Sequence, residues 1–308
     1  MNLGYVLYGY PKKSETWIIL EIAELEKRGH SVKIIDTSKY SSTNANEFYE
    51  DAKEIRNLDF LICHWAFTPR LICRLGVPYG ILSHAYDIWK DNGSTLKETS
   101  SHKNCKFVGC DTNYHRSKYI EWRIDKPLLD TPVCCDTDGL YKKKDFLGDK
   151  IVTGGRNKEK KGFKYAVAGF PHIHMFGSQS LEEYKKISPT ITTHGWLDKE
   201  KLRELLDDSW LFVSPNVASA DGDADGQCTT IKEALLMELQ ILTTPINGNA
   251  EYEYVHFSTV EDISKGCNGE VYKQIIKERN TKGRNWCIDN FSPKVCISKY
   301  LKAIEQFI

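Results

Sequence analysis

Short apolar runs alternate with amphipathic stretches from the start of the chain. Residues 3–10, LGYVLYGY, predict a buried strand, and residues 30–35, HSVKII, predict a second one. Between them, apolar residues recur at helical spacing up to Gly29, which predicts a helix with Ser14 or Thr16 as its N-cap. A strand–helix–strand opening is typical of a parallel α/β domain.

The same alternation continues along the rest of the chain. Strands are predicted at residues 59–65, 77–85, 106–111, 150–156, 172–178, 190–196, 210–215 and 240–245. Helices are predicted at residues 68–76, from Tyr114 onward, and at residues 180–187, 199–208, 230–239 and 292–308.

A polar segment from Asp136 to Lys144 interrupts this pattern and is typical of an interdomain linker. We therefore predict two Rossmann-like α/β domains, at residues 1–145 and 146–290, followed by a C-terminal helix at residues 291–308. We expect the two domains to face each other across a cleft. In open parallel sheets, ligands bind beyond the carboxyl ends of the strands, so candidate residues are sought there.

The composition is typical of a globular protein. The chain has 308 residues, of which 41% are apolar and 27% charged. Lysine plus arginine equals aspartate plus glutamate at 42 each, so no overall basic field would recruit nucleic acid or anionic lipid. No leader-like segment opens the chain, and no apolar run approaches the ~18 residues needed to span a bilayer. We expect a cytoplasmic protein.

The 10 cysteines follow no metal-binding spacing such as paired C-x-x-C. Most lie in apolar segments, for example Cys63, Cys73 and Cys110, which predicts buried free thiols. The adjacent pair Cys134–Cys135 has poor geometry for a disulfide.

The stretch DGQCTTIKE places two carboxylates, Asp225 and Glu233, around the start of a predicted helix. Gly226 allows close approach of the backbone to a ligand, and Thr229 and Thr230 lead into a helix whose first N–H groups have no internal partner. N–H donors suit a diphosphate and carboxylates suit sugar hydroxyls, so this stretch predicts a sugar-nucleotide site. In the alternative interpretation, Glu233 is a capping-box acid with Thr230 as N-cap.

Two metal-binding interpretations compete for the run Asp221–Gly226, DGDADG. It matches the first half of an EF-hand loop, but Lys232 stands where that loop requires a bidentate glutamate. A D-x-D site for a nucleotide sugar would stand at a strand end of a single-domain architecture, which the pattern does not predict. We expect no metal.

Three further side chains follow predicted strands. Arg156 and Lys161, in GGRNKEKKG, could reach a diphosphate as a planar fork and a point charge. His84 follows the apolar stretch GVPYGILS and could contact a sugar hydroxyl in a cleft. In the alternative interpretation, Arg156 and Lys161 belong to a solvated basic loop, and His84 has its hydrogen bonds satisfied within the fold and binds no ligand.

Taken together, six segments resemble the retaining GT-B glycosyltransferases of family 4, in order and over nearly the whole chain. They are YPKKSETWIILEIAELEKRGHSVKI, SHAYDIW, GGRNKEKKGF, THGWLDKEKLRELLDDSWLFVSP, ADGDADGQCTTIKEALLM and NFSPKVCISKYLKAIEQF. Four departures concern the site segments: Ala85 stands in place of the usual glycine, Asp225 in place of the commoner glutamate, Gln227 where an apolar residue is common, and Cys228 where proline is common.

The resemblance implies a GT-B fold whose C-terminal helix crosses back to the N-terminal domain. It implies that Arg156 and Lys161 hold the donor diphosphate together with Gly226, Thr229 and Thr230, and that Glu233 holds the ribose. His84 and Asp225 would act at the donor sugar as the catalytic pair. Ser14, Glu15 and Asp87 are expected on the acceptor side. No metal and no cofactor other than the donor is implied, since cations and a helix dipole offset the leaving diphosphate.

The expected activity is transfer of a hexose or pentose from a UDP- or GDP-sugar to a hydroxyl group, with retention of configuration. The expected acceptor is a glycan, a lipid-linked sugar or a small molecule. A DNA acceptor with hydroxymethylated bases stays open, because Lys12, Lys13 and Lys142–Lys144 could form a local basic patch. A non-catalytic sugar-nucleotide-binding module also stays open.

Overall fold

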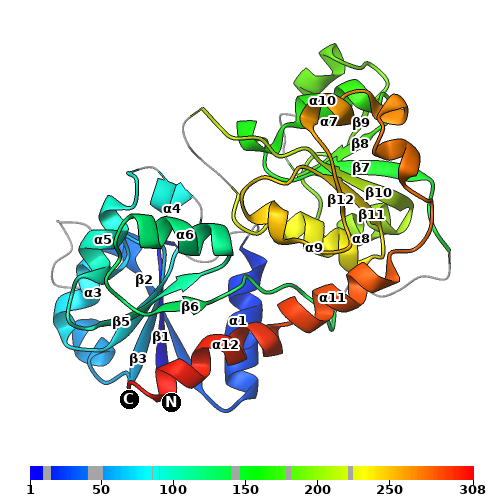
Figure 1. Cartoon of the computed structure of the whole chain (residues 1–308). Coiled ribbons are helices and arrows are strands. Elements are labelled where there is room, and N and C mark those ends of the chain that lie inside the picture. The colour runs from blue at the N-terminus through cyan, green and yellow to red at the C-terminus, as the bar shows by residue number, and fades with distance from the viewer. Residues whose placement is uncertain are drawn as a thin grey trace. The chain divides into compact units, whose positions relative to one another are not determined.

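The computed structural model describes residues 1–9, 15–40, 51–84, 86–89, 91–139, 146–177, 182–220 and 225–308. The chain divides into two compact units (Figure 1). Unit 1 comprises Met1–Cys134 and Pro293–Ile308, and unit 2 comprises Cys135–Ser292.

Unit 1 is built on a 6-stranded parallel sheet in the order β2-β1-β3-β4-β5-β6. Its strands are β1 (Asn2–Leu7), β2 (Ser31–Asp36), β3 (Phe60–His64), β4 (Tyr79–Leu82), β5 (Cys105–Cys110) and β6 (Leu128–Asp130). The central strands β3 and β4 are buried along their whole length, as expected where helices cover both faces of a parallel sheet. All carboxyl ends therefore meet at one edge.

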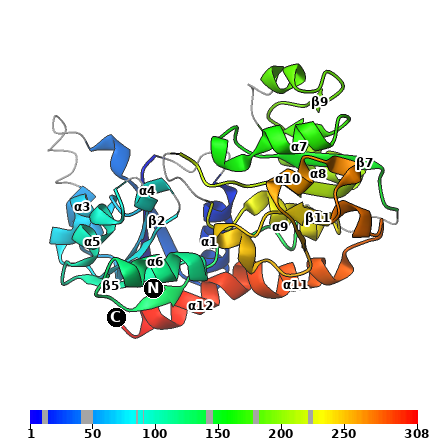
Figure 2. The ribbon, with the colours of Figure 1, turned by 45° about the horizontal axis from the view of Figure 1, so that its top comes forward.

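The helices of unit 1 include α1 (Thr16–Lys27), α3 (Pro69–Ile72), α4 (Tyr86–Trp89), α5 (Ser94–Ser100), α6 (Asn113–Glu121) and α12 (Pro293–Glu305), and residues 51–55 are helical as well. The C-terminal helix α12 lies beside α1 (Figures 1 and 2). Arg28 joins the two helices by donating to the Ser298 hydroxyl at 3.0 Å and to the Lys294 carbonyl at 2.7 Å. The end of the chain is thus part of unit 1.

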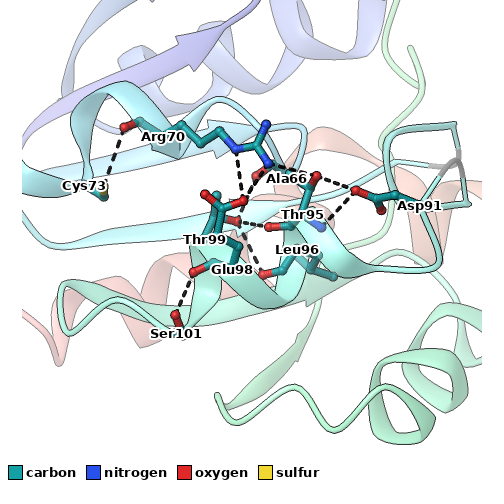
Figure 3. Close-up of polar contacts among 9 residues, drawn as sticks. All are labelled: Ala66, Arg70, Cys73, Asp91, Thr95, Leu96, Glu98, Thr99 and Ser101. Atoms are coloured by element: carbon teal, nitrogen blue, oxygen red, sulfur yellow. Dashed lines mark hydrogen bonds and ion pairs between the residues drawn. The ribbon is translucent and has the colours of Figure 1, made fainter.

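A polar network fixes the segment that follows β3 (Figure 3). Arg70 in α3 pairs with Glu98 in α5 at 2.6 Å and donates to the Thr95 hydroxyl at 3.3 Å. One turn further, the Thr99 hydroxyl donates to the backbone carbonyl of Ala66 at 2.8 Å. Since Ala66 lies two residues after the end of β3, helix α5 holds the chain at the carboxyl edge of the sheet.

Unit 2 repeats the architecture with a 6-stranded parallel sheet in the order β12-β11-β10-β7-β8-β9. Its strands are β7 (Lys150–Gly154), β8 (His174–Phe176), β9 (Thr192–Thr193), β10 (Ser209–Ser214), β11 (Gln240–Thr243) and β12 (His256–Phe257). Its helices are α7 (Phe163–Gly169), α8 (Lys199–Asp207), α9 (Thr229–Leu236), α10 (Val260–Ile263) and α11 (Thr281–Phe291).

The loop after β7 packs tightly on the end of β10. Gly162 has a φ of +59°, and a Cβ there would come within 1.9 Å of the Pro215 carbonyl oxygen. Any other residue would push the two loops apart, so this glycine is required by both its conformation and its contact. The contact brings the residues before α7 next to those after β10.

Most predicted strands and helices are present, with four corrections. Residues 182–186 form a 3-10 helix instead of part of an α-helix, and only Thr192–Thr193 of the predicted strand at 190–196 pairs with a neighbour. The N-cap of helix α1 is Glu15, and its side chain makes no capping hydrogen bond. Helix α9 begins at Thr229, so Thr230 is not its N-cap. The pattern also missed α4, α5, α10, α11, β6 and β12, which are short or weakly amphipathic.

All 10 cysteines are free, and Cys73 and Cys267 are the ones that are not buried. The prediction of buried free thiols is therefore confirmed for most of them. Among the described residues, no helix is both long and apolar enough to cross a bilayer.

Candidate active site

The carboxyl edge of the unit 2 sheet gathers three segments of the predicted donor site. The loop after β7 carries Arg156 and forms a short 3-10 helix over Glu159–Lys161. The second segment follows β10, and the third leads into α9. The backbone N–H of Val217 donates to the Lys160 carbonyl at 2.9 Å, which joins the first two segments.

Asp225 lies between two lysine ammonium groups. Its Oδ1 is 3.1 Å from Nζ of Lys160, and its Oδ2 is 2.7 Å from Nζ of Lys161. The Lys160 side chain is 4% exposed, that of Lys161 11% and that of Asp225 14%. The arrangement is a nearly dry cluster of two positive charges and one negative charge.

Both signs of charge are retained in this cluster. Burial alone would raise the pKa of Asp225, but the ammonium groups of Lys161 and Lys160 outweigh it and lower the pKa to about 2. Burial likewise opposes the charge of Lys161, but Asp225 outweighs it and raises the pKa of that ammonium above its ordinary value. The cluster therefore carries a net positive charge beside the start of α9.

Neighbouring polar groups hold the Asp225 carboxylate in place. The Asn216 amide donates to its Oδ2, and Asn216 in turn accepts from the Ser214 hydroxyl at 2.7 Å. Lys161 also donates to Sγ of Cys228 at 3.2 Å, and the backbone carbonyl of Cys228 accepts from the buried Tyr252 hydroxyl at 2.8 Å. The cluster is thus tied to β10 and to the N-cap of α9.

The other predicted donor residues belong to the same segments as this cluster. Gly226 is buried directly after Asp225, and the Thr230 hydroxyl lies 3.0 Å from Sγ of Cys228. Thr229 begins α9, whose N-cap residue makes no side-chain cap. Glu233, one turn along, is half-buried, and Arg156 is exposed in the loop after β7.

His84 belongs to the corresponding edge of unit 1, two residues after the end of β4. Its Nε2 is 3.1 Å from Nδ1 of His64, and its ring meets that of Trp17 edge-on at 4.4 Å. Burial lowers the pKa of His84 to about 4; Asp111 opposes this shift and His115 adds to it. Its imidazole is therefore neutral near pH 7.

Three residues of these two centres were missed by the sequence analysis. Lys160 belongs to the run GGRNKEKKG but was assigned no role there, and Asn216 follows the strand at 210–215 without matching a motif. His64 ends a strand, as His84 nearly does, which is the signal that could have found it.

Solved structures of glycosyltransferases share this architecture. AviGT4, a glycosyltransferase involved in avilamycin A biosynthesis, matches with a TM-score of 0.69 and 14% identity, over 100% of this chain and 98% of the other. Alr3699/HepE of Anabaena, in complex with UDP and glucose, matches with a TM-score of 0.73 and 11% identity, over 99% and 100%. The chain has the GT-B fold. An α-glucosyltransferase in complex with UDP and a 13-mer DNA containing an HMU base matches with a TM-score of 0.67 and 12% identity, over 98% of each chain.

At the sequence level, no protein-family model and no curated protein matches this chain. The similarity of this chain to the solved glycosyltransferases is therefore a similarity of fold.

Several predicted residues lie outside the described part of this GT-B fold. They are Ser14, the run Asp221–Ala224 of the alternative metal loops, the lysines Lys12, Lys13 and Lys142–Lys144, and the side chain of Asp87. Glu15 is described, at the N-cap of α1. Within the described ranges, no group of 3 or more His, Cys, Asp and Glu side chains is arranged to hold a metal ion.

Proposed function

We propose that the protein is a glycosyltransferase that moves a hexose or pentose from a nucleoside-diphosphate sugar to a hydroxyl acceptor. The observation that carries the proposal is the buried cluster of Lys160, Asp225 and Lys161 beside the first turn of α9. Two ammonium groups and the uncompensated N–H groups of a helix start form a receptor for a diphosphate. The GT-B fold of the chain agrees with this use.

In this proposal, the diphosphate of the bound donor replaces Asp225 as the ion-pair partner of Lys161. The exposed guanidinium of Arg156 and the N–H groups of Gly226, Thr229 and Thr230 complete the phosphate contacts. Asp225 stays ionised because Lys160 remains beside it, and its released oxygen accepts from the hydroxyls of the donor sugar. Glu233 accepts from the ribose, and the cationic groups stabilise the leaving diphosphate without a metal.

A uridine donor is favoured over a guanosine donor. Among the matched structures, HepE is solved with UDP, with UDP and glucose and with UDP-glucose, and the α-glucosyltransferase is solved with UDP. We further propose that His84 of unit 1 acts at the reacting sugar and that the transfer retains the anomeric configuration. Glu15 and Asp87 are proposed for the acceptor side.

A glycan, a lipid-linked sugar or a small molecule remains the first choice of acceptor. DNA with hydroxymethylated bases is the second, because the match to the α-glucosyltransferase solved with HMU-containing DNA covers 98% of both chains. The formal charge of 0 argues against strong non-specific DNA binding. Steeply salt-dependent binding to a hydroxymethylated duplex would favour this second acceptor.

Donor binding is tested by titrating UDP, UDP-glucose and GDP-mannose calorimetrically into the wild type and two lysine variants. Lys161→Ala is expected to weaken UDP-glucose binding about 10-fold to 100-fold, because it removes a charge-assisted contact worth about 1.5–3 kcal/mol. The matched control is Lys164→Ala, an exposed lysine that faces Tyr165, which should bind like the wild type. Equal affinities of both variants would overturn the assigned site.

Transfer is tested with radiolabelled UDP-glucose and acceptors of each class, in the presence of a metal chelator. The anomeric configuration of the product, read by NMR, reports retention or inversion. A protein that binds the donor tightly but transfers to no acceptor, and hydrolyses none, would be a sugar-nucleotide-binding module instead.

A further inference from the structure

One exposed and one half-buried aromatic ring meet at the carboxyl edge of the unit 1 sheet. Tyr8 follows β1 directly and is 54% exposed, and Phe67, which is half-buried, lies three residues after the end of β3. Since β1 and β3 are neighbouring parallel strands, both residues leave the sheet at the same edge. The two rings meet edge-on, with centroids 5.4 Å apart and planes at 81°. We call Tyr8 and Phe67 the aromatic corner.

The backbone on both sides of Tyr8 is fixed to the end of β2. The Thr37 hydroxyl donates to the Leu7 carbonyl at 2.8 Å, and the Gly9 N–H donates to Oδ1 of Asp36 at 2.8 Å. Gly9 has a φ of +85°, a conformation that glycine adopts without strain. An exposed side chain on a fixed backbone loses little conformational freedom when it binds a ligand, so Tyr8 is suited to recognition.

The turn that carries Phe67 is fixed as well. Trp65, directly after β3, has a φ of +71°, a strained conformation for a bulky residue. The Thr68 hydroxyl donates to the Trp65 carbonyl at 3.0 Å, and the Thr99 hydroxyl of α5 donates to the Ala66 carbonyl at 2.8 Å (Figure 3). A strained turn that neighbouring segments hold in place indicates a functional use for the rings it presents.

The aromatic corner is continuous with the end of β4, which leads to His84. Strand β3 lies between β1 and β4 in the sheet. The ring of Trp65, two residues before Phe67, has its centroid 6.3 Å from that of the His84 ring. A ligand on the corner therefore lies beside the residue proposed to act at the reacting sugar. This position favours the acceptor as the occupant, because the donor nucleotide is assigned to unit 2.

The charges beside the corner suit a neutral ligand. Burial alone would raise the pKa of Asp36, but hydrogen bonds from Ser38 and Gly9 outweigh it and lower the pKa below its ordinary value. Lys39, which adds to this shift, supplies the opposite charge. Together, Asp36 and Lys39 give no excess of the positive charge that a phosphodiester backbone requires.

A sugar ring matches the shape and chemistry of the corner. A pyranose carries C–H groups on its faces, which contact aromatic rings, and hydroxyls around its rim, which can exchange a hydrogen bond with the Tyr8 phenol. A flat nucleobase instead gains from stacking on parallel faces. Two rings at 81° cannot both lie parallel to one base, so the corner favours the sugar.

We propose that Tyr8 and Phe67 form a subsite for a sugar ring of the acceptor, so that the acceptor is a molecule that carries a sugar and not hydroxymethylated DNA. Calling the bound sugar the acceptor rests on the proposed glycosyl transfer, whereas the binding of a sugar at the corner does not. Tyr8 supplies the more exposed ring, so its loss has the larger effect.

Sugar binding is tested by saturation-transfer NMR. The probes are methyl glycosides of glucose, galactose, mannose and N-acetylglucosamine, with hydroxymethyl-deoxyuridine as the competing class of ligand. The wild type is expected to transfer saturation to the ring C–H groups of at least one glycoside. Tyr8→Ala should weaken that binding about 10-fold, comparable to the loss of an aromatic stacking contact, while Tyr8→Phe keeps the ring and should retain most of it.

The matched control is Tyr254→Ala, which removes a tyrosine of unit 2 that is 47% exposed and should leave the binding of the glycoside as in the wild type. Equal binding by Tyr8→Ala and Tyr254→Ala would overturn the subsite, as would an absence of saturation transfer to every glycoside. Binding of the nucleoside alone would also overturn it, and would assign the corner to a base.

Transfer kinetics test whether the sugar bound at the corner is the acceptor. Tyr8→Ala should raise the KM for the acceptor about 10-fold and leave the KM for the donor unchanged, because the donor contacts are assigned to unit 2. General damage to the fold would raise both values, so the difference between them reports the subsite. The glycoside that binds best should also inhibit transfer competitively with the acceptor. An unchanged KM for the acceptor in Tyr8→Ala would overturn this assignment.

The two proposals fail separately. If no nucleotide sugar binds and no transfer occurs, the glycosyltransferase proposal fails, while the binding of glycosides at the corner remains measurable. If transfer occurs but Tyr8→Ala changes neither glycoside binding nor the KM for the acceptor, only the present proposal fails.

Discussion

The two units bury polar centres at the carboxyl edges of similar sheets, but burial has opposite consequences for charge in them. In unit 1, burial lowers the pKa values of His64 and His84, so both rings are neutral. In unit 2, the pKa of Asp225 is about 2 and that of Lys161 is raised, so both groups stay charged. Similar architecture therefore supports two kinds of chemistry.

The difference lies in what each group has for a neighbour. The two imidazoles mainly face each other, and a second positive charge would add repulsion to the cost of burial. Asp225 instead faces two cations within 3.1 Å, and their attraction exceeds the desolvation cost. A neutral ring is suited to exchanging a proton, whereas a fixed positive cluster is suited to holding an anion.

The largest effect is expected where the charge balance of unit 2 is broken. Asp225→Ala leaves Lys160 and Lys161 buried without a counter-charge, and should lower the free energy of unfolding by about 3–5 kcal/mol. Urea denaturation measures it. The control is Asp208→Ala, which removes the partner of Lys150 from an exposed pair and should cost at most about 1 kcal/mol. Comparable losses in the two variants would show that the cluster is not effectively dry.

Acid should destabilise unit 1 before it affects the charge cluster of unit 2. Unfolded His84 binds a proton near pH 6.5 and folded His84 only near pH 4, so the unfolded state holds more protons in between. Stability should therefore fall as pH drops from about 6.5 to 4, by at most about 3.5 kcal/mol from this residue at about 1.4 kcal/mol per pKa unit. The free energy of unfolding against pH should be flatter in His84→Gln. If the free energy of unfolding of His84→Gln depended on pH as steeply as that of the wild type, the conclusion that the His84 ring is neutral would be wrong.

The charge cluster should respond only at lower pH. The pKa of Asp225 is lowered from 3.8 to about 2, so its stabilising effect is complete above pH 3.8 and is lost as pH falls toward 2. The loss should amount to about 2 kcal/mol. It is measured as the difference in unfolding free energy between wild type and Asp225→Asn, which should be constant above about pH 4 and shrink below it. A difference that already shrinks near pH 6 would mean that Asp225 is not held by the lysines.

The sequence predicted the alternation of strands and helices well, because apolar periodicity reports burial. It placed Lys161, Asp225 and His84 at strand ends, where parallel topology gathers ligand contacts. It did not predict that Lys161 and Asp225 pair with each other, because their distance depends on how the loop after β7 packs on β10 through Gly162.

The direction of individual side chains was the weakest part of the sequence analysis. In the run KEKK, periodicity does not distinguish an inward lysine from a solvated one, and a 3-10 turn buries Lys160. Likewise, Thr230 matched a capping pattern, but the N-cap of α9 is Cys228, two residues earlier. Glu21 occupies a helical position where a surface acid is common, but it is buried against β1 and accepts from the Tyr5 hydroxyl.

The smallest effect is expected from the second histidine pair. His174 and His194 are stacked at 18° with nitrogens 3.0 Å apart, close to the 15° and 3.1 Å of His64 and His84. They are half-buried, and water can replace a lost partner, so His194→Gln should change the free energy of unfolding by less than about 0.5 kcal/mol. The fully buried His64 lacks that replacement, and His64→Gln should cost about 1–3 kcal/mol. Parallel urea denaturation of the two variants compares them; equal losses would mean that ring geometry, and not burial beside Glu21, determines the energetic weight of a histidine pair.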